Sequence, residues 1–133
     1  MQLHEYQAKE ILKNNNVPIP EGQIASTSDD SKKISLSLGG KCVVKAQVHA
    51  GGRGKAGGIK IIKDKDELIK EAKAMFGKIL ITHQTGPFGK QVKRLYLEEG
   101  CNIKKEFYLS CLVDRKSSKI AFISRTSWRQ KVC

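Results

Sequence analysis

Glycines and basic side chains occur together between Val48 and Gly58, and in combination they could bind a polyphosphate. The segment reads VHAGGRGKAGG, with five glycines, one arginine and one lysine. Glycine lets the backbone approach a ligand closely and adopt a positive φ without steric cost. Successive backbone N–H groups can then form an anion-binding concavity, to which Lys45, Arg53 and Lys55 add positive charge. We therefore predict that this segment binds phosphate groups.

A flexible loop between two strands is the alternative interpretation of so many glycines. Such a loop usually mixes glycine with the turn-forming residues Ser, Asn and Asp. Here the glycines are mixed with Arg53 and Lys55, and Lys45 interrupts the apolar run before them. A lysine in an apolar strand either faces outward to solvent or faces an anion that offsets the cost of its burial. The sequence favours the phosphate site.

Two common phosphate-binding motifs do not fit the segment. Residues Gly52–Gly57 match G-x-G-x-x-G, but that fingerprint needs a helix to follow, and Ile59–Lys63 has the β-branched composition of a strand. A P-loop needs Gly-Lys-Ser or Gly-Lys-Thr, and neither occurs. The order strand, glycine loop, strand predicts a hairpin over phosphates, as in protein kinases. The kinase motifs His-Arg-Asp and Asp-Phe-Gly do not occur in the sequence.

Periodicity and capping signals predict the elements that position this hairpin. Leu3–Leu12 has the apolar spacing of an amphipathic helix, which ends before Pro18. A second helix is predicted at Ser28–Leu38, with Ser28 and its following acids as the cap, and a third from Asp64 until Gly77. The whole order predicts an α+β domain. Strands are predicted at Cys42–Val48, Ile59–Lys63, Ile79–Thr82, Val92–Glu98, Glu106–Val113 and Lys119–Ser124, the last two forming a hairpin.

The net charge of +12 supports a rival function, that of a basic nucleic-acid-binding module. The lysines are nevertheless spread along the chain, and the aromatic content of 6% offers no pair of residues placed to stack on bases. We therefore expect only non-specific, salt-sensitive contact with nucleic acid. No apolar run approaches the roughly 18 residues of a membrane span, and no targeting segment opens the chain, so we expect a cytoplasmic protein without a membrane partner.

The four cysteines do not follow a metal-binding spacing. Cys42 and Cys111 lie in apolar, strand-like runs, while Cys101 and Cys133 do not. Buried or free thiols in a reducing compartment explain this pattern better than disulfides do. At 133 residues the chain is long enough to bury a core.

The run Val44–Gly58 resembles the signature of the β subunits of succinate–CoA ligases. Similarity to that family extends from residue 1 to about residue 124. It implies an ATP-grasp fold, within the α+β class, in which residues 1–124 are an incomplete nucleotide-binding domain. The further matching motifs are Leu3–Lys9, Val17–Pro20, Leu97–Glu99, Lys105–Leu109 and Val113–Arg115.

The resemblance also implies which residues bind ATP or ADP. It assigns Lys45 to the phosphates, and Glu98, with a backbone contact at Cys101, to the adenine and ribose. A solvated carboxylate at a strand edge is the alternative for each glutamate. No catalytic residue is expected on this chain, because the family's phosphohistidine belongs to the partner α subunit. The expected nucleotide-binding residues are Lys45, Gly52, Arg53, Gly54, Glu98, Cys101 and Glu106.

The activity implied by the resemblance is that of an ADP-forming succinate–CoA ligase in the bacterial cytoplasm. Such an enzyme couples ATP and ADP to the interconversion of succinate and CoA with succinyl-CoA, within the tricarboxylic acid cycle. Its Mg²⁺ ligands are expected downstream of this chain, and the α subunit is expected to supply the CoA site. Residues 125–133 no longer resemble the family, so we expect a truncated or frameshifted gene and a fragment inactive alone. The glycine motif also leaves open a malate–CoA or citrate-cleaving ligase.

Overall fold

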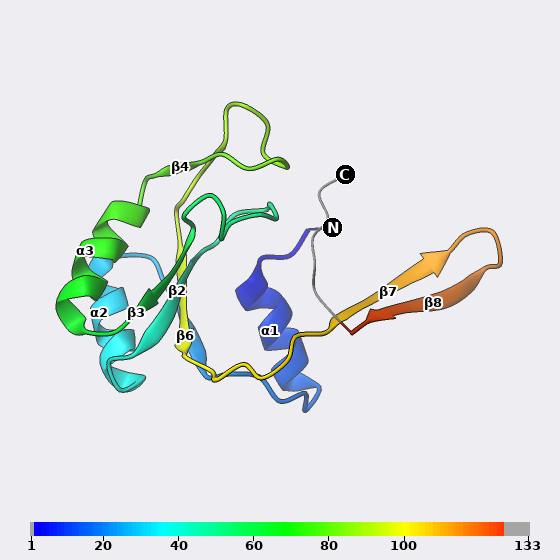
Figure 1. The fold of residues 1–133 in the computed structure, drawn as a ribbon, viewed down its shortest axis with the longest axis horizontal. Helices are drawn as coiled ribbons and strands as arrows, with labels where there is room; N and C mark the ends of the chain where they lie inside the picture. Colours follow the sequence, from blue (N-terminus) through cyan, green and yellow to red (C-terminus); the bar gives the residue numbers. More distant parts are fainter. Residues whose placement is uncertain (1, 127–133) are drawn as a thin grey trace. The chain divides into compact units, whose positions relative to one another are not determined.

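The computed structural model describes residues 2–126 and divides the chain into two compact units, Met1–Gly100 and Cys101–Cys133. Each unit is described by itself (Figure 1). Helices and antiparallel strands are interspersed along the first unit, and the described residues of the second form one hairpin. This content confirms the predicted α+β class.

Four antiparallel strands form the main sheet of the first unit. The register places Lys45 opposite Tyr96, and Val43 opposite Glu98. Across the sheet the order is β1 (Gly22–Ala25), β6 (Leu95–Glu99), β2 (Cys42–Ala46) and β3 (Ile59–Ile62). A smaller antiparallel pair consists of β4 (Ile79–Leu80) and β5 (Lys90–Gln91). The predicted hairpin on either side of the glycine loop is thus confirmed as β2 and β3.

The helices lie on both faces of this sheet. Helices α2 (Ser28–Ser37) and α3 (Lys65–Met75) pack against each other on one face, and α1 (Glu5–Asn14) lies on the opposite face (Figure 1). Successive side chains of a strand point to opposite faces, so each strand has one core side and one side toward α1. The core lies on the α2–α3 side, where it includes Ile34, Val44, Ile62, Leu68, Ala72, Met75, Leu95 and Leu97.

Polar caps fix where α2 and α3 begin. Thr27 Oγ1 accepts the Asp30 N–H at 3.1 Å, and the Asp30 carboxylate accepts the Thr27 N–H at 3.1 Å. Thr27 is therefore the N-cap of α2, and the prediction of Ser28 for this position was wrong by one residue. The predicted cap of α3 is confirmed, because Asp64 accepts the Glu67 N–H at 2.9 Å. Gly77 follows α3 with a φ of 78°, as expected of a C-terminal stop.

Several predicted elements differ from the structure. The short strands β1 and β5 were not predicted, and β6 begins at Leu95 instead of Val92. Helix α1 runs from Glu5 to Asn14, two residues later than predicted, and none of its ten residues is buried. The predicted apolar stripe is only partly covered, since the relative exposure of Ile11 is 50%. The spacing was helical, but α1 is not a core helix.

The second unit contains the predicted hairpin of two strands, β7 (Tyr108–Asp114) and β8 (Lys119–Arg125). In the turn, the Asp114 carboxylate accepts the Ser117 hydroxyl at 2.6 Å and the Lys116 N–H at 3.0 Å. Cys111 is exposed although its run is apolar. Other exposed apolar residues of the hairpin include Leu109, Val113, Ile120 and Phe122. Of the predicted divergent tail, residues 127–133 lie outside the described part of the chain.

Two further expectations concern thiols and membranes. Cys42 and Cys111 are free thiols, and burial raises the pKa of the Cys42 thiol. Over residues 2–126, the structure contains no helix with the length and apolar character that crossing a bilayer would require.

Candidate functional site

Lys45 lies on the face of the sheet that α1 covers. Its neighbours in β2, Val44 and Ala46, point into the core, so alternation turns Lys45 to the opposite side. The Lys45 side chain is only 17% exposed, and its ammonium group contacts the carboxylates of Glu5 and Glu98. The outward-facing alternative is thus wrong for Lys45: within the described residues these two carboxylates supply the negative charge, and contact with a phosphate stays a prediction.

Four side chains form a closed arrangement of alternating charge, which we call the charge ring: Glu5, Lys9, Glu98 and Lys45. Lys45 Nζ lies 2.9 Å from Glu5 Oε1, and Lys9 Nζ lies 3.7 Å from the same oxygen. Both lysines also contact Glu98, one at each carboxylate oxygen. Glu98 is buried with 6% relative exposure, whereas Glu99 is exposed, so consecutive acids face opposite sides as the alternation requires.

Arg53 connects the glycine loop to the charge ring. Its Nη2 donates to Glu5 Oε2 at 2.6 Å, and its Nη1 donates to the Ala46 carbonyl at 2.8 Å. Both oxygens of the Glu5 carboxylate therefore accept from cations, one on strand β2 and one on the loop. A carboxylate held between a lysine and an arginine marks a position where an anion is stabilised.

Burial and charge act in opposite directions on the groups of the ring. Burial favours the neutral form of Glu5, but hydrogen bonds and charges from Lys45 and Arg53 outweigh it and lower the Glu5 pKa. Burial likewise acts to lower the Lys45 pKa, while Glu98 and Glu5 raise it above its ordinary value. Burial, followed by the charges of Glu98, Glu5 and Glu21, raises the pKa of Tyr96 to about 12. Lys45 and Glu5 are thus both charged at neutral pH.

The glycine loop, residues 47–58, folds back on itself between β2 and β3. The Gly58 N–H donates to the Arg53 carbonyl at 2.7 Å, and the Ala46 N–H donates to the Gly58 carbonyl at 2.8 Å. Gly52 has a φ of 76°, a conformation that L residues rarely adopt. Gly54 has no positive φ, and a Cβ built there would meet only Ile59 Cδ1, at 3.9 Å. Space and backbone strain therefore explain the glycine at 52 and not the one at 54.

A polar pocket of about 340 Å³ adjoins the loop. Its lining includes Glu5, His49, Arg53 and Gln84, and Gln84 accepts the Gly51 N–H at 2.5 Å. His49 stacks on His4 with 3.7 Å between ring centroids. This contact joins the start of the loop to the residue that precedes α1.

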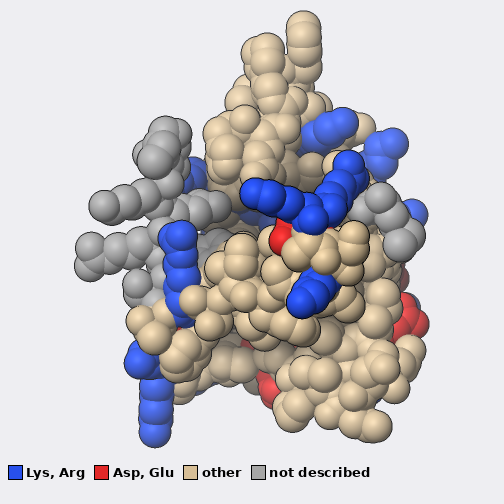
Figure 2. Space-filling view, turned by 90° about the vertical axis from the view of Figure 1, so that its right-hand side faces the viewer, with Lys and Arg blue, Asp and Glu red and all other residues tan. Residues whose placement is uncertain are grey.

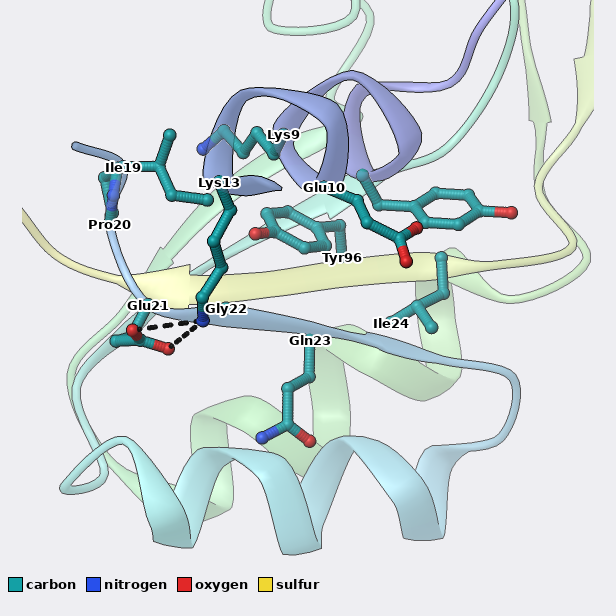
Figure 3. A pocket seen from close by; sticks show the side chains of 11 residues that line it. Lys9, Glu10, Lys13, Ile19, Pro20, Glu21, Gly22, Gln23, Ile24 and Tyr96 are labelled. Atoms are coloured by element: carbon teal, nitrogen blue, oxygen red, sulfur yellow. Dashed lines mark hydrogen bonds and ion pairs between the residues drawn. The ribbon is translucent and has the colours of Figure 1, made fainter. Parts of the chain in front are cut away.

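A second pocket, of about 200 Å³, lies between α1 and β1 (Figure 3). In Figure 3 the Lys13 side chain reaches from α1 toward Glu21, and the distance from Lys13 Nζ to that carboxylate is 3.4 Å. The Tyr96 ring forms part of the wall, and a Cβ at Gly22 would lie 2.5 Å from its hydroxyl. Gly22 thus allows the tyrosine to lie against β1.

The sequence-predicted residues divide between the two units. Lys45 and Arg53 come together at Glu5, Glu98 contacts Lys45, and Gly52 and Gly54 lie on the adjoining loop. Cys101 and Glu106 belong to the second unit and are exposed, so their part in the site stays a prediction. No group of three His, Cys, Asp or Glu side chains suited to a metal ion occurs in residues 2–126.

Sequence reasoning missed Glu5 and Lys9. Their i,i+4 spacing on a helix is a signal of a local ion pair, and the pair exists at 3.7 Å. Nothing in that spacing indicates that both side chains also reach the sheet, to Lys45 and Glu98. Those contacts join residues far apart in the chain, so only the folded topology reveals them.

Comparison with known proteins places these features in a family. The family profile described as "ATP-grasp domain" matches residues 2–127. Over 125 residues the chain is 61% identical to the succinate–CoA ligase [ADP-forming] subunit β of Pelagibacter ubique. It is 52% identical over 124 residues to the same subunit of Geobacillus thermodenitrificans. These alignments cover 93% and 92% of the chain but only 32% of each relative, so the chain spans about a third of their length.

Two solved structures share this fold at much lower sequence identity. PH1788 from Pyrococcus horikoshii matches with a TM-score of 0.73 at 19% identity, over 94% of this chain and 52% of that one. An ATP citrate lyase from Methanothrix soehngenii, in complex with citrate and coenzyme A, matches with a TM-score of 0.71 at 15% identity, over 95% and 32%. The predicted fold and family resemblance are confirmed, and this chain belongs to the ATP-grasp domain family.

Proposed function

We propose that this chain forms the nucleotide-binding part of the β subunit of an ADP-forming succinate–CoA ligase. One observation carries the proposal: Lys45 and Arg53, on different elements, converge on a single carboxylate beside a glycine loop. The two cations and the loop backbone would hold the phosphates of ATP or ADP. The 61% identity to the subunit from Pelagibacter ubique supports this choice of enzyme.

The proposed contribution of the chain to catalysis is to position the nucleotide and stabilise its charge. Phosphoryl transfer depends mainly on holding the phosphates in line and neutralising the charge that develops on them. Lys45, Arg53 and the N–H groups near Gly52 and Gly54 suit that task. We place adenine and ribose near Glu98 and the Cys101 backbone, with Glu106 as a further contact.

The remaining parts of the reaction are assigned outside the described residues. We propose that a partner α subunit carries the phosphohistidine and the CoA site, in the cytoplasm of a bacterium. Mg²⁺ would neutralise phosphate charge when bound, and its ligands would lie outside residues 2–126, within which no group of three His, Cys, Asp or Glu side chains suits a metal ion. We further propose that this chain alone binds nucleotide without completing the ligase reaction.

Two alternatives have weaker support. A citrate-cleaving or malate–CoA ligase would use the same loop, but the likeness to the ATP citrate lyase, at 15% identity, concerns the fold alone. Nucleic-acid binding is suggested only by the charge of +12. Figure 2 shows lysine and arginine side chains at separate places on the face that it draws, and this arrangement favours loose, salt-sensitive contact.

A titration of the purified chain with ATP tests the proposal. We expect saturable binding that Lys45→Ala weakens by about tenfold or more, because a hydrogen bond to a charged group is lost. Arg53→Ala should have a similar effect. Isothermal titration calorimetry with and without Mg²⁺ provides the measurement.

Lys41→Ala is the matched control, since Lys41 is exposed and lies one residue before β2. It removes the same charge and should change the affinity by less than about twofold. Equal losses from Lys41→Ala and Lys45→Ala would point to unspecific attraction by the basic surface. That result would contradict the proposed site.

A further inference from the structure

Helix α1 is attached to the sheet by charged groups more than by buried apolar ones. None of its ten residues is buried, and Ile11 and Leu12 are 50% and 42% exposed. By contrast, the side chains of Glu5 and Lys9 are only 19% and 17% exposed, and both reach the sheet. The position of α1 is therefore coupled to the lysine and arginine of the proposed phosphate site.

Glu5 restricts two long side chains that would otherwise be free to rotate. Its Oε1 accepts from Lys45 at 2.9 Å and its Oε2 accepts from Arg53 at 2.6 Å. Lysine and arginine lose more side-chain entropy than most residues when they are fixed in one orientation. One carboxylate, that of Glu5, fixes both cations in this way.

Glu5 leaves hydrogen-bond donors available for a phosphate. A lysine ammonium has three N–H donors. Lys45 directs one to Glu5 and one to Glu98, so its third donor remains for a phosphate. A guanidinium has five, and Arg53 uses one on Glu5 and one on the Ala46 carbonyl. A phosphate can thus be bound without displacing Glu5. Protein kinases use a comparable arrangement, in which a helix glutamate orients the strand lysine that contacts the nucleotide.

We infer that Glu5 is a positioning residue, which holds Lys45 and Arg53 in the orientation that a nucleotide phosphate meets. The inference rests on the proposed function, because the phosphate is that of the nucleotide. Through Glu5, α1 sets the affinity of the site without contacting the ligand. The gain from fixing both cations in advance exceeds the repulsion between the Glu5 carboxylate and the phosphate.

Calorimetric titration of the whole chain with ATP tests this role. Glu5→Gln keeps the size of the side chain and removes its charge, and we expect the Kd to rise about five- to tenfold. Glu5→Asp keeps the charge but shortens the reach, and it should also weaken binding. Asp29→Asn, an exposed acid on α2, makes the same change in net charge and should leave the Kd within about twofold. Circular dichroism establishes that each variant is folded.

A double-mutant cycle and a ligand-free measurement separate the outcomes. If Glu5 acts through the cations, Glu5→Gln should have a smaller effect in an Arg53→Ala background than in the natural chain. In ¹⁵N NMR without ligand, the Arg53 guanidinium signals should be resolved in the natural chain and averaged in Glu5→Gln. Unchanged or tighter ATP binding by folded Glu5→Gln would overturn the inference and leave the proposed function intact. Absence of binding by the natural chain would overturn the proposed function, and unaltered Arg53 signals would then exclude the restraint by Glu5 as well.

Discussion

Lys45 has two carboxylate partners on one face of β2, while the other face of that strand is apolar and lies in the core. A lysine side chain removed from water needs compensating charge, and Glu5 and Glu98 provide it. A paired charge that is partly buried adds little net stability, but removal of one partner is costly. The charge ring is therefore better explained by its orientation of the Lys45 and Arg53 side chains than by a contribution to the free energy of unfolding.

His4 makes the stability of the chain sensitive to acid. Burial, followed by the charges of His49, Arg94 and Arg53, lowers the His4 pKa below its ordinary value. The folded chain thus binds fewer protons than the unfolded chain below about pH 6.5. Stability should be fully present above that pH and fall as the pH drops from about 6.5 through the folded pKa.

Thermal unfolding between pH 8 and pH 5 checks this expectation. His4→Phe keeps an aromatic ring to stack on His49 but cannot be protonated, so the loss below about pH 6.5 should be reduced. His83→Phe, at an exposed position, should retain the pH dependence of the natural chain. The reverse pattern would contradict the role of His4. Acid loss caused by Glu5, whose pKa is lowered, appears only below about pH 4.5.

The glycine loop is the element in which structural and functional demands can be separated. Gly52 has a φ of 76°, and a Cβ there would lie 3.1 Å from His83 Nδ1. Gly54 has no positive φ, and a Cβ there would have no close contact. If the loop backbone approaches phosphates, the glycine at 54 is needed by the ligand and not by the fold.

Gly54→Ala should therefore weaken ATP binding by about tenfold while leaving the free energy of unfolding unchanged or higher by up to ~1 kcal/mol. Gly52→Ala should reduce that free energy by about 1–2 kcal/mol, because alanine resists a positive φ. Urea unfolding and ATP titration of both variants provide the measurements. Normal ATP affinity in Gly54→Ala would show that the backbone at 54 does not approach the ligand.

Sequence could predict the elements whose signals are local. Each of these elements is marked by residues that lie close together in the chain: the N-cap of α3, the stop at Gly77, and the strand–loop–strand order around the glycines. Strand β1 has four residues, one of them glycine, and is defined by pairing with β6, as in Gly22 opposite Glu98. That pairing joins distant parts of the chain, so no local pattern indicates it.

The same distinction applies to the site. Lys45 and Arg53 could be selected from the sequence because a cation in an apolar strand and a cation among glycines are unusual. Glu5 could not be selected, since an exposed-looking acid in the first turn of a helix is ordinary. Its importance comes from two contacts across the sheet face, to Lys45 and Arg53.

At the scale of the whole chain, the two units differ in what supports them. The first has a four-stranded sheet with helices on both faces and a contiguous buried core. The hairpin of β7 and β8 has two strands, and apolar residues such as Leu109 and Phe122 are about 70% exposed (71% and 72%). An isolated two-stranded hairpin is only marginally stable in water.

Hydrogen exchange should report this difference directly. Backbone amides of the central strands β2 and β6 should exchange slowest, because their exposure requires opening of the core. Amides that pair β7 with β8 should exchange much faster, through local opening of the hairpin. Exchange followed by mass spectrometry on peptides from each unit provides the measurement. Equal protection in both units would contradict the expectation and mean that the hairpin gains support in solution.

The charge ring also restricts how this chain can change over evolutionary time. Its two acids and two lysines sum to zero, and their side chains are between 8% and 19% exposed. A single substitution that removes one charge takes one partner from each of two neighbouring charges and leaves the ring with a net charge in a poorly hydrated place. A lineage that loses Glu5 should therefore also lose a lysine or gain an acid nearby. Positions 5, 9, 45 and 98, from α1, β2 and β6, should then show correlated substitutions among related sequences. Such correlation would reveal these contacts, which one sequence alone does not show.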